Sequence, residues 1–185
     1  MIGVQDLRKS VTFELDGELY QVLDYHHHKP GRGNAIIRTK LRNLRTGATI
    51  ERTFQSGDRV QDVRLDHATV QYLYHDERFY YFMNTETYEQ PALTKEALGD
   101  AVNYLTDGLE LELETYEGEP ITIKLPTTVD LKVVEAEPGF AGDTASSATK
   151  NCVVETGLQV EVPLFIEPGD VIRVDTRSGK YITRV

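Results

Sequence analysis

The sequence predicts a mainly β protein made of three small β-barrels. Apolar residues recur at every second position along most of the chain, which is the period of a strand with one buried face. Turn-forming pairs such as Asp16-Gly17 separate these stretches. Only the stretch around residue 100 has the spacing of a helix. We therefore divide the 185 residues into predicted domains 1–63, 64–127 and 128–185.

The first domain is predicted to be a barrel of four or five strands. Val11, Phe13 and Leu15 alternate with polar neighbours, and Asp16-Gly17 then turns the chain into a returning strand. Arg45-Thr46-Gly47 is a second turn signal. The predicted strands span residues 11–15, 19–25, 36–44 and 48–54, and the last ends at Ser56-Gly57-Asp58.

The second domain has the pattern of an oligonucleotide-binding (OB) barrel with one helix. Strands are predicted at 69–74 and 79–83, and two more lie on either side of Glu117-Gly118. Thr94 is a predicted N-cap. The helix after it would bury one apolar face, formed by Ala97, Leu98, Ala101, Val102 and Leu105. Strands with one interposed helix fit a five-stranded OB barrel.

The third domain is predicted to be another small barrel. Its strands are expected at 131–136, 158–162, 171–175 and 181–185. A loop rich in Gly, Ala, Ser and Thr is expected over 138–151. Each barrel is small and buries only about 60% of its unfolded surface, so we expect the barrels to pack on one another.

Composition excludes several classes of protein. One cysteine excludes an internal disulfide framework and a Cys-rich zinc site. No run approaches 18 apolar residues, which argues against a membrane span. The first residues lack the charged and apolar pattern of a secretion signal. We expect a cytoplasmic, acidic, monomeric protein with no membrane association.

The formal charge of −10 is unevenly distributed. Residues 1–63 carry 10 basic and 8 acidic side chains, whereas residues 64–127 carry 4 and 13. No Asp or Glu lies between Tyr25 and Ile50, and this stretch holds six cations: Lys29, Arg32, Arg38, Lys40, Arg42 and Arg45. Such polarity is typical either of a solvated surface or of an arm that faces RNA phosphates.

Candidate catalytic groups are few, and we predict no enzyme activity and no cofactor. In His26-His27-His28 only two side chains share a strand face, which is too few for a metal site. His75 and Asp76 fall in a predicted turn, where charged residues are ordinary. Cys152 is interpreted as a small core residue rather than a nucleophile.

The most informative stretch, residues 29–35, predicts a thin, positively charged hairpin tip between two strands. Pro30 fixes its own φ and favours an extended Lys29. Gly31 and Gly33 flank Arg32 with positions that tolerate positive φ and carry no side chain. Arginine presents a planar fork of donors to phosphate or ribose oxygens. The tip therefore fits a narrow RNA crevice, and the alternative is an ordinary turn that carries an arginine.

The tip also resembles the Lys-Pro-Gly-(Lys/Arg)-Gly signature of the bacterial elongation factor P family. Other family motifs are matched in order along the whole chain: Met83-Asn84-Thr85-Glu86-Thr87-Tyr88-Glu89-Gln90, Gly142-Asp143-Thr144-Ala145, Glu155-Thr156-Gly157, Val160-Glu161-Val162-Pro163, Phe165-Ile166 and Asp175-Thr176-Arg177-Ser178-Gly179-Lys180-Tyr181. The chain departs from the family at Asn151-Cys152, where Pro-Ala is usual.

The resemblance implies an SH3-like (KOW-type) first domain and two OB domains, arranged in an L similar to tRNA. It implies a non-enzymatic translation elongation factor that binds both ribosomal subunits between the peptidyl and exit tRNA sites. There it would stimulate peptide-bond formation and relieve stalling at consecutive prolines.

The resemblance also assigns residues. Arg32 would reach the acceptor end of the peptidyl-tRNA. The loop residues Lys29, Pro30, Gly31, Gly33 and Asn34 would contact RNA around it. Gly142, Asp143 and Thr144 would approach the exit-site codon of the mRNA, and Tyr181 and Arg184 would contact the tRNA or the small subunit. Many members carry an enzymatic extension at the tip, β-lysyl on lysine or rhamnose on arginine. Arg32 excludes lysylation, which leaves rhamnosylation by an arginine rhamnosyltransferase or no modification.

The rival function is a general binder of single-stranded nucleic acid, which would stack bases on aromatic side chains in a basic groove. Here the aromatic residues gather in the acidic second domain, which argues against that function. They are Tyr72, Tyr74, Phe79, Tyr80, Tyr81 and Phe82.

Overall fold

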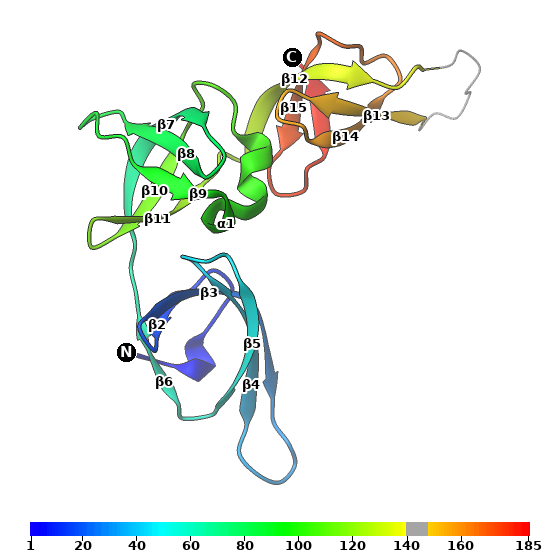
Figure 1. The fold of residues 1–185 in the computed structure, drawn as a ribbon. Coiled ribbons are helices and arrows are strands. Elements are labelled where there is room, and N and C mark those ends of the chain that lie inside the picture. Colours follow the sequence, from blue (N-terminus) through cyan, green and yellow to red (C-terminus); the bar gives the residue numbers. More distant parts are fainter. Residues whose placement is uncertain (140–147) are drawn as a thin grey trace. The chain divides into compact units, whose positions relative to one another are not determined.

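The computed structural model describes residues 1–139 and 148–185 and contains three β-sheets that follow one another along the chain (Figure 1). By their contacts these residues form two compact units. The first comprises 1–68, 93–99 and 113–122, and the second comprises 69–92, 100–112 and 123–185. The prediction of a mainly β protein with barrel-like sheets is confirmed. No helix among the described residues has the length and hydropathy to cross a membrane.

The first sheet has six strands in the order β1-β6-β2-β3-β4-β5. They are β1 (Ile2–Gly3), β2 (Thr12–Leu15), β3 (Glu18–His28), β4 (Ile36–Asn43), β5 (Thr49–Gln55) and β6 (Arg59–Asp62), and the 3-10 turn η1 (Val4–Asp6) follows β1. Asp16 and Gly17, with φ of 53° and 81°, form the predicted turn between β2 and β3. The strands β1 and β6 were not predicted, because β1 has only two residues and β6 contains a single apolar residue, Val60, so neither displays an alternating pattern.

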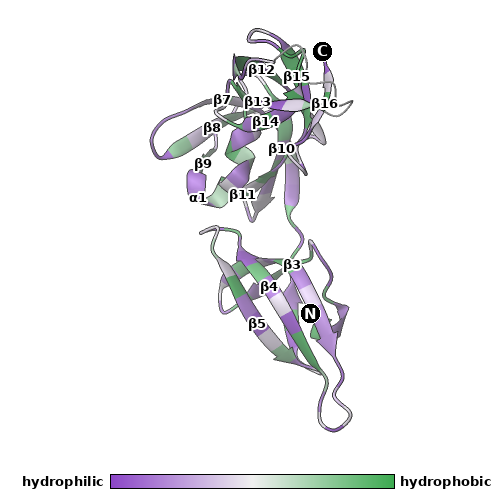
Figure 2. Cartoon of the chain, turned by 90° about the vertical axis from the view of Figure 1, so that its right-hand side faces the viewer, coloured by the Kyte–Doolittle hydropathy of each residue, from purple (hydrophilic) through white to green (hydrophobic). Residues whose placement is uncertain are grey.

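Alternation along β4 separates a core face from an outer face. Ile37, Thr39 and Leu41 are buried, whereas Arg38 and Lys40 are exposed. Figure 2 shows this change between hydrophobic and hydrophilic residues along β4 and its neighbours. The predicted third strand and its basic face are therefore confirmed.

The second sheet has the order β11-β10-β7-β8-β9. Its strands are β7 (Asp66–His75), β8 (Phe79–Asn84), β9 (Ala92–Thr94), β10 (Glu110–Tyr116) and β11 (Glu119–Lys124). The N-cap prediction is confirmed, since Thr94 Oγ1 accepts a hydrogen bond from Ala97 N at 3.2 Å. The prediction of one long helix is wrong. The α-helix α1 (Lys95–Leu98) ends at Gly99, whose φ of 58° is incompatible with its continuation, and the 3-10 helix η2 (Gly99–Tyr104) follows.

The third sheet has the order β14-β13-β12-β15-β16. Its strands are β12 (Thr128–Ala136), β13 (Thr149–Val154), β14 (Gln159–Pro163), β15 (Val171–Asp175) and β16 (Tyr181–Arg184). The loop predicted over 138–151 is wrong at its end, because β13 already begins at Thr149. Cys152 lies in β13 opposite Val160 and is buried, so the prediction of a core residue is confirmed. Burial raises the pKa of its thiol, which disfavours the reactive thiolate.

Within each unit, residues from successive sheets share a core. In the first unit, Leu19 and Leu44 pack in one buried cluster with Ile121 of β11. In the second unit, Tyr104 at the end of η2 packs in the buried cluster of the third sheet, and Asn103 O accepts a hydrogen bond from Thr156 Oγ1 at 2.6 Å. These shared clusters supply apolar burial that a small barrel lacks on its own.

The turn after β15 is organised by one carboxylate. Asp175 Oδ1 accepts hydrogen bonds from the backbone N–H groups of Arg177 and Ser178, at 2.8 and 3.3 Å. Its Oδ2 lies 3.0 Å from the Arg177 guanidinium. These interactions, of which the side-chain bond to Arg177 is the largest, lower the pKa of Asp175 to about 2.

We expect Asp175→Asn to reduce the pH dependence of the unfolding free energy in acid. An unfolded aspartate titrates near about 3.9. The ionised Asp175 therefore stabilises the fold above about pH 4, and this contribution is lost as the pH falls toward 2. Urea unfolding of both proteins at several pH values measures the effect. If the unfolding free energies of the two proteins fell in parallel between pH 4 and 2, the stabilising role of ionised Asp175 would be contradicted.

Candidate nucleic-acid interface

The loop that carries Arg32 is held at both ends by paired strands. β3 and β4 pair antiparallel as far as His28 opposite Ile36, and Ile36 also lies opposite Gln55 of β5. The carbonyl of Ala35 accepts a hydrogen bond from Ser56 N at 2.8 Å. The prediction of a hairpin tip is confirmed, and its base belongs to the sheet.

The loop itself points its polar groups into solvent. Lys29, Gly31, Arg32, Gly33 and Asn34 are all exposed. Gly33 has a φ of 106°, whereas Gly31 does not have a positive φ, so only one of the two glycines adopts the conformation that both tolerate. A Cβ at either glycine would meet no atom within 4 Å. No hydrogen bond or ion pair joins Arg32 to another residue of the described chain, and its five N–H donors stay available.

Two of the six cations in the acid-free stretch are engaged elsewhere. Arg45 donates two hydrogen bonds to the Glu119 carboxylate, at 3.3 and 3.2 Å, and one to Gly17 O at 3.1 Å. The bond to Glu119 raises the pKa of Arg45. Arg42 donates to Ala97 O at 3.3 Å. These arginines hold parts of the first compact unit together and are not free for phosphate.

The exposed cations of β4 differ in their neighbours. Lys40 lies opposite Asp24 on β3 and Glu51 on β5. These two carboxylates reduce the positive electrostatic potential around the Lys40 ammonium group. Arg38 lies opposite His26 on β3 and has no carboxylate in either neighbouring position. The most positive part of the sheet is thus its end near the loop, around Arg38, Arg32 and Lys29.

The groups weighed as metal or catalytic sites have structural partners. His26 Nε2 lies 3.3 Å from Asp24 Oδ2. His75 Nδ1 is hydrogen-bonded to the Tyr72 hydroxyl at 2.8 Å. Asp76 Oδ1 accepts two backbone hydrogen bonds inside the turn before β8. Among the described residues, no group of three or more His, Cys, Asp or Glu side chains is arranged to hold a metal ion.

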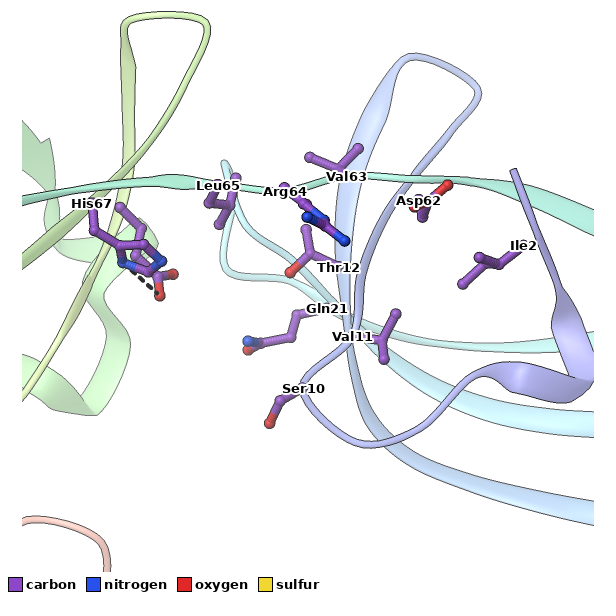
Figure 3. Close-up of a pocket in the computed structure, with 11 residues that line it drawn as sticks. Ile2, Ser10, Val11, Thr12, Gln21, Asp62, Val63, Arg64, Leu65 and His67 are labelled. Carbon is purple, nitrogen blue, oxygen red and sulfur yellow. Dashed lines mark ion pairs between the residues drawn. The ribbon is translucent and has the colours of Figure 1, made fainter.

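A separate cavity of about 400 Å³ lies in the first unit beside the segment that joins β6 to β7 (Figure 3). Ser10, Gln21 and Arg64 are among the residues that line it. His67 Nδ1 lies 3.9 Å from Glu114 Oε1, and Figure 3 shows Ser10 well apart from His67. Ser10 is therefore not paired with His67, and none of residues 29–34 lines the cavity.

Two other predicted contact residues, Tyr181 and Arg184, lie in β16 of the third sheet. Tyr181 is half-buried against the core. The Arg184 guanidinium lies 5.2 Å from the centre of the Phe165 ring and 3.9 Å from Asp170. Gly142, Asp143 and Thr144 fall outside the described residues.

Comparison with known proteins assigns the chain to a family. Family models match along its length: "Elongation factor P (EF-P) KOW-like domain" at residues 3–60, "Elongation factor P (EF-P) OB domain" at 65–123 and "Elongation factor P, C-terminal" at 129–184. Elongation factor P of Moorella thermoacetica is 54% identical over 184 residues, and that of Thermotoga maritima is 52% identical over 184 residues, with 100% of each chain covered. The chain belongs to the elongation factor P family.

This membership confirms the resemblance drawn from the sequence motifs and makes the chain a translation elongation factor of the elongation factor P type. A solved structure, "Eukaryotic translation initiation factor 5A from Methanococcus jannaschii", is 21% identical with a TM-score of 0.50. The likeness covers 68% of this chain and 90% of that one, and it bears on the fold alone.

Sequence reasoning did not separate the cations that are exposed from those that are engaged. Arg38 and Arg42 share one face of β4, and alternation treats them alike. They differ because Arg42 donates a hydrogen bond to the carbonyl of Ala97, which lies 55 residues from Arg42 in the sequence. The anchor between Ser56 and Ala35 was missed for the same reason.

We expect Gly33→Ala to disturb the loop, whereas Gly31→Ala should not. Both positions have room for a methyl group, but only Gly33 has a backbone conformation that alanine disfavours. Gly33→Ala should cost about 1 kcal/mol of unfolding free energy and shift the amide signals of residues 29–35. Denaturant unfolding and two-dimensional NMR measure both effects. Equal behaviour of the two variants would contradict the role of Gly33.

Proposed function

We propose that this elongation factor P family member binds the ribosome between the peptidyl and exit tRNA sites and orders the acceptor end of the peptidyl-tRNA with its Arg32 loop. This would stimulate peptide-bond formation and relieve stalling at consecutive prolines. The observation that carries the proposal is the unpaired Arg32 guanidinium at the end of a hairpin whose base is fixed by three strands.

The mechanism requires no bond chemistry from the protein. The ring of proline restricts its φ and its approach as a nucleophile, so two prolines spend little time in reactive geometry. Holding the peptidyl-tRNA in place lowers the entropic part of the barrier. Each ~1.4 kcal/mol of barrier removed raises the rate tenfold. Hydrogen bonds to charged groups contribute roughly 1.5–3 kcal/mol each. A few such bonds from Arg32 and the loop backbone would therefore be enough to raise the rate of peptide-bond formation tenfold or more.

The distribution of charge supports binding in which the Arg32 loop faces RNA and residues 64–127 face away from it. Lys29, Arg32 and Arg38 form the positive end of the first sheet, suited to ribosomal RNA and tRNA phosphates. Residues 64–127 carry 13 acidic and 4 basic side chains and would be repelled by phosphate. The domain limits 1–63, 64–127 and 128–185, the L-shaped arrangement and the exit-site role of Gly142, Asp143 and Thr144 remain predictions. So do the contacts of Tyr181 and Arg184.

The chemical state of Arg32 is part of the proposal. Its exposure makes the guanidinium accessible to a modifying enzyme, and rhamnosylation and an unmodified arginine both fit. The intact mass of the protein from its native host, with the tryptic peptide that holds Arg32, distinguishes the two. An added deoxyhexose would identify an arginine rhamnosyltransferase as a partner.

We expect Arg32→Ala to abolish rescue of a polyproline reporter while the fold stays intact. The side chain makes no contact whose loss would destabilise the protein, so the unfolding free energy should change by less than ~0.5 kcal/mol. Arg52→Ala, which removes an exposed arginine from β5, is the matched control and should retain rescue. Wild-type rescue by Arg32→Ala would show that the tip is not the functional element.

We also expect ribosome binding to weaken with salt, and Arg38→Gln to reduce this dependence more than Lys40→Gln. The logarithm of the affinity falls linearly with the logarithm of the salt concentration, and each lost phosphate contact makes this slope shallower by about 1. Lys40 is flanked by two carboxylates in register, so it should contribute less than Arg38. Ribosome pelleting at several salt concentrations gives the slopes. A flat wild-type profile would argue against a phosphate-facing surface.

A further inference from the structure

The outer face of the β7–β8 hairpin carries three aromatic residues, Tyr74, Phe79 and Tyr81, which we call the aromatic strip, and Met83 follows on the same face of β8. A register shift between Tyr72 and Tyr74 places Tyr74 opposite Tyr81. Their rings stack with centroids 4.7 Å apart, and Phe79 lies 6.4 Å from Tyr81. Tyr74 is 55% exposed even though its ring stacks on Tyr81.

A fixed anion lies at one end of the aromatic strip. Asp76 Oδ2 accepts a hydrogen bond from the Tyr81 hydroxyl at 2.7 Å, and Oδ1 accepts from Arg78 N and Phe79 N at 2.8 Å each. The backbone bond from Phe79, with those from Tyr81 and Arg78, lowers the pKa of Asp76 and keeps the carboxylate ionised. The Arg78 guanidinium already lies 5.8 Å from the centre of the Phe79 ring. The aromatic strip therefore accommodates a guanidinium of its own chain, while Tyr74 is left open.

We propose that the aromatic strip binds an arginine-bearing segment of a partner protein. A guanidinium can stack on the face of Tyr74 and interact with the ring quadrupole, and the nearby Asp76 carboxylate adds charge complementarity. The acidic excess of residues 64–127 attracts such a segment and repels a phosphate backbone. A protein segment therefore fits this surface better than RNA. The aromatic strip and the Arg32 loop belong to different compact units, and the inference does not depend on the role of that loop.

The test is a titration of the full-length protein, followed by two-dimensional NMR. The probes are a peptide of six Gly-Arg repeats, a peptide of six Gly-Lys repeats with the same charge, and a uridine dodecamer. The arginine peptide should shift the signals of Tyr74 and Tyr81 and bind more tightly than the lysine peptide, because only guanidinium is planar enough to stack.

Tyr74→Leu is the informative variant, because it keeps an apolar side chain on the strand and removes the π face. We expect this variant to bind the arginine peptide about threefold to fivefold more weakly than the wild type. Tyr88→Leu, which alters a 70% exposed tyrosine outside the strip, should leave the affinity unchanged. Thermal unfolding checks that both variants fold.

Three outcomes would overturn the proposal. The first is equal affinity of Tyr74→Leu and the wild type for the arginine peptide. The second is an equal response to the lysine peptide, which would indicate general attraction to an acidic protein. The third is tighter binding of the dodecamer at the aromatic strip, which would identify a nucleic-acid surface.

Discussion

Antiparallel pairing of β3 with β4, with one register shift between Val22 and Asp24, is the constraint on which the candidate site depends. The pairing runs from Tyr20 opposite Asn43 to His28 opposite Ile36, and β5 supports β4 as far as Gln55. A loop of this length on a flexible base would lose much of its contact energy to ordering. Here the paired strands restrict that freedom in advance, so the contact that we propose needs to order only the short segment around Arg32.

The same sheet divides its cations between two tasks. Arg42 donates a hydrogen bond to Ala97 O, and Arg45 donates to the Glu119 carboxylate. These two guanidinium groups therefore stabilise the first compact unit. Arg38 lies in β4 near the loop, Arg32 lies within the loop, and both residues are exposed. The RNA contact that we propose therefore falls at the loop end of the sheet, whereas the arginines at the opposite end stabilise the fold.

The second sheet shows how one hairpin can present two different faces. The register shift in β7 leaves Tyr72 buried opposite Phe82 and turns Tyr74 outward opposite Tyr81. Burial raises the pKa of Tyr72 to about 12, as expected for a phenol held in the core. The aromatic residues of the second domain therefore divide between a core face, where Tyr72 and Phe82 are buried, and an outer face, where Tyr74 is exposed.

The sequence by itself determined the β class, the Arg32 hairpin and the family, because alternation, turn residues and ordered motifs are local features. It could not determine that the helix near residue 100 breaks at Gly99, that β13 begins at Thr149, or which arginines are engaged. It also could not place Tyr74 and Tyr81 side by side. Those outcomes depend on partners far apart in the chain and on one irregular register, and only the packed tertiary structure brings such groups together.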